Sequence, residues 1–158
     1  FVTGHFRGAK KKISEENVAK VYDFFKGHTF YMQKTFNEAF ADTSVNEECS
    51  GEKIKAAISV LVDSYDTIFR EILSNVPEKQ KELLYAIAID GEASSITSSA
   101  FIRRHRLSSA SSVQSAVKKL LEKDLVTISH KVYSISDRFF ALWLATQMGP
   151  DDPLQSLV

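Results

Sequence analysis

The spacing of the apolar residues changes abruptly within residues 109–135. A helical face of period 3.6 comes first, formed by Val113, Ala116, Val117, Leu120 and Leu121. Residues 125–128 and 132–135 follow directly as two β-prone runs, joined by a turn at 129–131. A helix therefore leads straight into a short hairpin, and the segments around it indicate which larger fold the two belong to.

The residues that typically begin and end helices divide the rest of this half of the chain into short elements. A helix is predicted from Pro77 to Gly91, followed by a short extended segment at 94–96. Thr97 or Ser98 would cap a brief helix, Ser108 or Ser109 the next one, and Asp137 a last helix that runs to Met148. The order helix, strand, helix, turn, helix and hairpin predicts a winged helix-turn-helix domain with a small β-wing and a closing helix over residues 77–148.

The first half of the chain has only helical patterns. Helices are predicted over residues 1–12, 14–27 and 29–41, then a polar loop over 42–51 and one long amphipathic helix over 52–75. The predicted fold class is therefore mainly α. Residues 1–76 form a helical region with a long linking helix, residues 77–148 form the winged helix, and residues 149–158 form a tail expected to be frayed or to belong to a following segment.

The net charge favours no class of partner, because Lys plus Arg and Asp plus Glu both number 20. Residues 92–138 are different, since eight basic and four acidic side chains give this stretch a charge of +4. The single cysteine, Cys49, excludes an internal disulfide and fits a reducing cytoplasm. No stretch approaches the roughly 18 apolar residues of a membrane span. A cytoplasmic location without membrane contact is therefore expected, and the start at Phe1 suggests a piece of a longer protein.

The predicted helix at 109–124 is the recognition helix of a helix-turn-helix, whose first half enters the major groove in DNA-binding members. Serine and glutamine side chains can hydrogen-bond to bases, and lysine and arginine can neutralise phosphates. The candidate DNA-binding residues are Ser109, Ser112, Gln114, Ser115, Lys118, Lys119, Arg103, Arg104, Arg106 and Lys131.

A packing or regulatory role explains the same residues. No arginine lies early in the predicted recognition helix, so the most common specific contact, arginine to guanine, is missing. Serines also cap helices, and cations favour helix C-termini. Winged helices serve as protein-contact modules as well, so double-stranded DNA and a protein partner both stay open.

Two stretches together resemble a known family. The segment FKGHTFYMQKTFNEAF is similar to the "GGhPyyiQ" segment in the helical lid of prokaryotic AAA+/STAND-type ATPases. The segment YSISDRFFALWL is similar to the "Y.i.DpfFrfWl" signature after their winged helix. The resemblance covers nearly the whole chain and implies an AAA+ lid-like helical bundle followed by a winged helix.

The resemblance also implies how the chain would work. In such proteins the lid closes over nucleotide bound to the preceding ATPase domain, which would be the partner of this chain, with ATP and Mg²⁺ as its cofactors. The matching turn gives Gly27, His28 and Thr29 as nucleotide-sensing candidates, although the family more often has proline where this chain has Thr29. His28 can equally be a residue that starts a helix.

This chain by itself is expected to be non-catalytic and to hold no cofactor. It has no G-x-x-x-x-G-K-[ST] phosphate loop and no strand that ends in acidic residues for Mg²⁺. The four histidines show no metal-ligand spacing, so no metal site is predicted.

Two functions follow as hypotheses. In the first, the chain is the C-terminal part of a bacterial AAA+/STAND-type protein and couples nucleotide state to DNA or to a protein partner. In the second, it is a DNA-binding transcriptional regulator with an N-terminal helical module for oligomerisation or effector binding.

Overall fold

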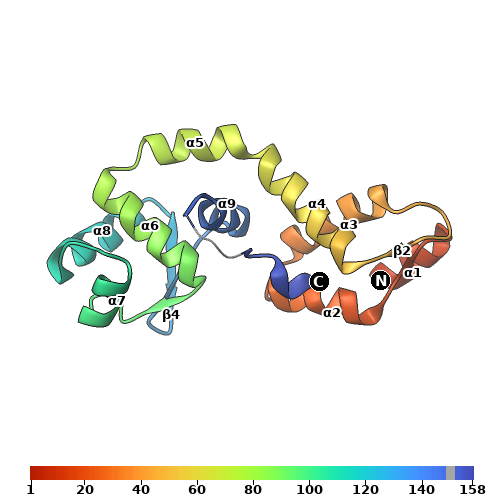
Figure 1. Ribbon diagram of the computed structural model, residues 1–158, viewed down its shortest axis with the longest axis horizontal. Coiled ribbons are helices and arrows are strands. Elements are labelled where there is room, and N and C mark those ends of the chain that lie inside the picture. Colours follow the sequence, from red (N-terminus) through yellow and green to blue (C-terminus); the bar gives the residue numbers. More distant parts are fainter. Residues whose placement is uncertain (149–151) are drawn as a thin grey trace. The chain divides into compact units, whose positions relative to one another are not determined.

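The computed structural model describes residues 1–148 and 152–158 of the chain (Figure 1). Its contacts divide the chain into two compact units: one comprises Phe1–Tyr65 together with residues 152–158, and the other begins at Asp66. Both units are mainly helical, as predicted. None of the described helices is long and apolar enough to cross a membrane.

The first unit consists of short helices and one pair of very short strands. In chain order its elements are α1 (Val2–Gly8), β1 (Lys12–Ile13), α2 (Glu15–Phe24), α3 (Thr29–Asp42), β2 (Glu48–Cys49), α4 (Gly51–Ser64) and the 3₁₀ helix η1 (Gln155–Leu157). As predicted, Ser14 caps α2, and its hydroxyl accepts a hydrogen bond from the Asn17 backbone N–H at 3.1 Å. Helices α3 and α4 pack against each other, and Phe36 and Ile58 are buried in this unit.

The segment 42–51 is not purely a loop, because β2 within it pairs in parallel with β1. The expected frayed tail is also wrong for residues 152–158, where Leu154 and Leu157 are buried. A Cβ atom at Gly51 would clash with the Leu157 carbonyl oxygen, so only glycine admits the tail at this point. Residues 149–151 of the predicted tail lie outside the described residues.

The second unit has the element order predicted for a winged helix. It contains α5 (Asp66–Ser74), α6 (Glu78–Asp90), β3 (Ala93–Ser94), α7 (Ser99–Arg104), α8 (Ala110–Glu122), β4 (Val126–Ser129), β5 (Val132–Ile135) and α9 (Arg138–Met148). The strands form one antiparallel sheet in the order β3–β5–β4, in which Val126 pairs with Ile135 and Ser94 with Val132. Helix α6 packs on both α8 and α9, and Leu83, Leu84 and Ile87 are fully buried.

The predicted long helix over residues 52–75 is interrupted. Helix α4 ends at Ser64, and at Tyr65 the backbone turns to φ −96° and ψ 2°. The Tyr65 N–H bonds to the Val62 carbonyl, three residues earlier, instead of continuing the four-residue ladder. The compact units consequently divide at Tyr65–Asp66, whereas the sequence places the junction at Pro77.

Helix α5 belongs to the winged-helix unit because its apolar face packs on α9. The Phe69 ring lies 5.1 Å from the Phe140 ring and 5.9 Å from the Trp143 ring, measured between centroids. The indole N–H of Trp143 donates a hydrogen bond to Asp66 Oδ1 at 2.9 Å. Trp143 is only 3% exposed, which confirms the predicted core role of this side chain.

Asp66 also makes the stability of this unit dependent on pH. The Arg70 guanidinium, and secondly the Trp143 N–H, lower the pKa of the Asp66 carboxyl below its usual value. A depressed folded-state pKa adds stability above the unfolded-state pKa of about 3.9, and this stability is lost as pH falls through the folded pKa. We therefore expect Asp66→Asn to lose less stability than the native chain between pH 6 and pH 3 on urea unfolding. Equal losses in both proteins would contradict this assignment.

Candidate functional site

The start of α8 is fixed by capping. Ser109 precedes the helix, and its hydroxyl accepts a hydrogen bond from the Ser112 backbone N–H at 3.2 Å. The Ser109 hydroxyl also lies 3.1 Å from the Ser111 hydroxyl. Two of the predicted DNA-binding serines therefore take part in the cap: Ser109 supplies its hydroxyl and the half-buried Ser112 supplies its backbone N–H.

Helix α8 presents a polar face beyond its cap. Gln114, Ser115 and Lys118 are exposed, and their spacing of three and four residues places them on one side of the helix. The opposite side is buried and includes Val113 and Leu120. Packing thus accounts for the apolar residues of α8, and these three polar side chains are available to a partner.

A groove of about 370 Å³ lies between α8 and the sheet of the winged helix. Two predicted site residues, Gln114 and Lys131, line it from α8 and from the turn between β4 and β5. Sequence reasoning missed the other lining residues as parts of a site: Ser94, Ser95, Ile96, Thr97, Val117, Ile128, His130 and Tyr133. The groove is therefore formed by α8, the β4–β5 hairpin and the segment that leads into α7.

The hairpin places Lys131 at its tip. His130 and Lys131 have positive φ angles of 50° and 65°, and Ser129 pairs with Val132 on either side of them. Two consecutive residues with positive φ form the tight turn whose twist matches that of the flanking strands. The exposed Lys131 side chain therefore extends from the end of the wing.

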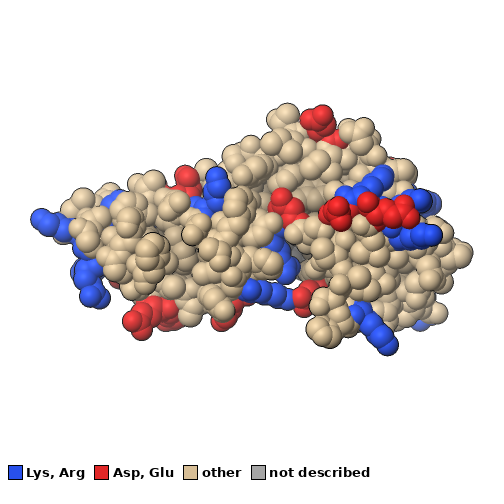
Figure 2. Space-filling model, turned by 180° about the vertical axis from the view of Figure 1, so that it is seen from behind, with Lys and Arg blue, Asp and Glu red and all other residues tan. Residues whose placement is uncertain are grey.

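Two of the predicted phosphate-binding cations are paired with acidic groups. Arg104 forms an ion pair with Asp90, and His105 Nε2 lies 3.1 Å from the same carboxylate. Lys119 Nζ lies 2.8 Å from the Glu122 carboxylate, and this contact lowers the pKa of Glu122. Figure 2 shows the same mixture on the face it presents, where acidic side chains lie beside lysine and arginine side chains.

The other four predicted phosphate-binding cations are not paired with acidic groups among the described residues. Arg103, Arg106, Lys118 and Lys131 are exposed, and none of them forms an ion pair or side-chain hydrogen bond within the part of the chain that the structure describes. Lys118 has only a weaker electrostatic interaction with the Glu122 carboxylate, which pairs directly with Lys119. Arg103 lies in α7 and Arg106 in the turn before α8. The unpaired positive charge therefore lies in the helix-turn-helix and at the wing tip.

The nucleotide-sensing candidates lie in the first unit, at the turn between α2 and α3. Gly27 has a φ of +72°, and its N–H donates a hydrogen bond to the Tyr22 carbonyl at 2.9 Å. His28 is exposed at the N-cap position of α3 without a side-chain capping bond. Gly27 and Thr29 line an apolar pocket, and His28 is not among its lining residues.

Comparisons with known proteins agree with the fold of the second unit. A family model described as a probable winged helix domain matches residues 67–146. No curated protein and no solved structure matches the chain. The matched region begins in α5, at nearly the same point as the second compact unit.

Proposed function

The chain belongs to the probable winged helix domain family, and we propose that its winged helix binds double-stranded DNA through α8 and the wing. The observation that carries the proposal is the set of four exposed, unpaired cations in the helix-turn-helix and at the wing tip. Lysine and arginine bind DNA mainly by displacing counterions from phosphates, which requires that their charge is not already neutralised. Arg104 and Lys119 are each paired with a carboxylate and have a smaller part in the proposal.

The polar face of α8 supports the same function. Gln114 is exposed and can form two hydrogen bonds with adenine in the major groove, while the Ser115 hydroxyl can reach either bases or phosphates. Lys118 follows Gln114 by one helical turn and would contact the adjacent backbone. The polar side chains of Gln114, Ser115 and Lys118 favour DNA over a protein partner, because the cores of protein interfaces are depleted in charged residues.

The neighbouring residues Lys118 and Lys119 provide a matched test. Alanine at either position removes one positive charge. A difference in duplex affinity between the two variants therefore reports the loss of a direct contact and not the change in net charge. We expect Lys118→Ala to weaken duplex binding several-fold more than Lys119→Ala. It should also reduce the slope of log affinity against log salt by about 0.9. Fluorescence anisotropy of a labelled duplex at several salt concentrations measures both, and identical behaviour of the two variants would contradict direct contact.

The proposal extends to the longer protein. The two resemblances support a C-terminal lid and winged helix of a prokaryotic AAA+/STAND-type ATPase, in which ATP and Mg²⁺ bind to a preceding domain. Nucleotide state there would change the access of DNA, or of a protein partner, to α8. A phosphate loop encoded upstream of Phe1 would support this context, and its absence from the gene would exclude it.

A DNA-binding transcriptional regulator is the alternative. Its N-terminal helices would then serve in oligomerisation or in effector binding, and no ATPase domain would be needed. A dimer by size-exclusion chromatography with light scattering, together with a palindromic binding site, would favour the regulator. A monomer on an asymmetric site would favour the ATPase context.

A further inference from the structure

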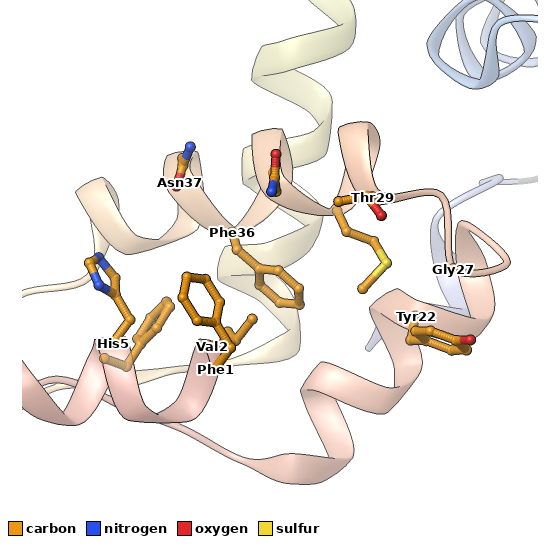
Figure 3. Close-up of a pocket in the computed structure, with 11 residues that line it drawn as sticks. Phe1, Val2, His5, Tyr22, Gly27, Thr29, Phe36 and Asn37 are labelled. Carbon is orange, nitrogen blue, oxygen red and sulfur yellow. The ribbon is translucent and has the colours of Figure 1, made fainter.

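The first unit contains an apolar pocket of about 240 Å³ that the DNA-binding proposal does not use. Helix α1, the end of α2 and helix α3 surround it. Phe6 and Phe36 form its buried part, with 1% and 6% of their surface exposed. Figure 3 shows Phe1, Val2 and Phe36 grouped on one side of α3, while the amide of Asn37 points away from them.

One aromatic side chain at the edge of this pocket is left largely uncovered. Tyr22 is 55% exposed, although it lines the pocket. Gly27 lies against the Tyr22 side chain, since a Cβ atom at this position would be 3.0 Å from the Tyr22 hydroxyl oxygen. A molecule in the pocket would cover this ring and remove apolar surface from water, which is favourable by about 25 cal/mol per Å².

The lining is mainly apolar. Its residues include no lysine, arginine, aspartate or glutamate, and its polar side chains include those of His5, Thr29, Gln33 and Asn37. A strongly charged ligand would give up part of its hydration here and gain few charged partners, which is unfavourable. The pocket therefore favours an uncharged molecule.

The volume of the pocket limits the size of its ligand. A dry apolar cavity of about 150 Å³ is enough to bind benzene, and sites for drug-sized molecules begin near about 300 Å³. The volume of about 240 Å³ lies between these values. From this volume, the aromatic walls and the mainly apolar lining, we propose that the pocket binds a small neutral aromatic molecule of one or two fused rings.

Indole is a suitable probe, and the chain provides its own reporter, because Met32 lines the pocket. In the whole chain labelled with ¹³C-methyl methionine, indole should shift the Met32 methyl signal saturably through its ring current. No shift of Met32 up to the solubility limit of indole would overturn the proposal.

Filling the pocket gives the second arm of the test. Val2→Trp places a large ring among the lining residues, and Val45→Trp is the matched control because Val45 is 59% exposed and does not line the pocket. We expect Val2→Trp to weaken indole binding at least about tenfold, equivalent to about 1.4 kcal/mol, and Val45→Trp to leave it unchanged. Equal affinity of the two variants would overturn the proposal.

Two further measurements keep the result unambiguous. If circular dichroism shows that Val2→Trp does not fold, Tyr22→Ala replaces it. The Tyr22 side chain lines the pocket and is exposed, so we expect its removal to change the stability of the chain little. Adenosine monophosphate is the comparison ligand, because it tests the nucleotide contact predicted for Gly27 and Thr29. A shift of the Met32 signal with this nucleotide and none with indole would overturn the proposal of a neutral aromatic ligand. This result is independent of whether the chain binds duplex DNA.

Discussion

Trp143→Ala is expected to lower the free energy of unfolding of the winged-helix unit by about 3–5 kcal/mol, the usual cost of truncating a large buried aromatic side chain. Trp143 is 3% exposed and packs on Phe69 and Phe140, so its removal leaves a cavity between α5 and α9. The substitution also leaves Asp66 without the indole N–H. Because Trp143 is the only tryptophan, unfolding should be followed by far-UV circular dichroism and not by fluorescence.

Ile89→Ala is the matched control for this result. Ile89 lies in α6 of the same unit and is 49% exposed, so its truncation should change stability by no more than about 0.5 kcal/mol. If the two variants were equally stable, α5 would not be part of the packed winged-helix unit, and the division of the chain at Tyr65–Asp66 would lose its energetic support.

Capping was predictable because it depends on residues close together in sequence. Thr97 or Ser98 was predicted to cap α7 and Asp137 to cap α9, and the structure shows Ser98 Oγ accepting the Phe101 N–H at 3.2 Å. Asp137 Oδ1 accepts the Phe139 N–H at 2.8 Å. The winged-helix order followed from such local signals together with the change of apolar period after Leu121.

Non-local features were not predictable in the same way. The parallel pairing of Lys12 with Glu48, and of Ile13 with Cys49, joins two segments that carry no strand pattern of their own. The break at Tyr65 has no proline or glycine to announce it, and the apolar stripe continues on both sides of it. The docking of Leu157 beside Gly51 depends on a contact between distant parts of the chain.

The candidate site shows the same contrast between local contacts, which could be predicted, and non-local contacts, which could not. The Lys119–Glu122 pair spans one helical turn and could be expected from its spacing, whereas the pairing of Arg104 with Asp90 joins α7 to α6. Residue type alone gave all six cations equal weight, and the folded chain shows that Arg104 and Lys119 are paired with carboxylates. The groove was missed because Ser95 and Thr97 join Gln114 only when the sheet forms.

Reversing two of the unpaired charges should have the largest effect on binding. Lys118→Glu/Lys131→Glu replaces one cation on α8 and one at the wing tip by repulsive groups. We expect duplex affinity to fall at least about 100-fold at low salt, and the slope of log affinity against log salt to become shallower by about 1.8, since each lost phosphate contact contributes about 0.9. Both side chains are exposed, so the fold should be retained.

Lys12→Glu/Lys34→Glu is the control, because it produces the same change in net charge at two exposed residues of the first unit. The measurement is the anisotropy of a fluorescent duplex titrated with the native chain and both variants over a series of salt concentrations. We expect salt-dependent binding by the native chain, nearly the same binding by the control, and loss of binding with a shallower slope in Lys118→Glu/Lys131→Glu. No binding by the native chain at low salt, or equal losses in the two variants, would contradict a DNA interface on α8 and the wing.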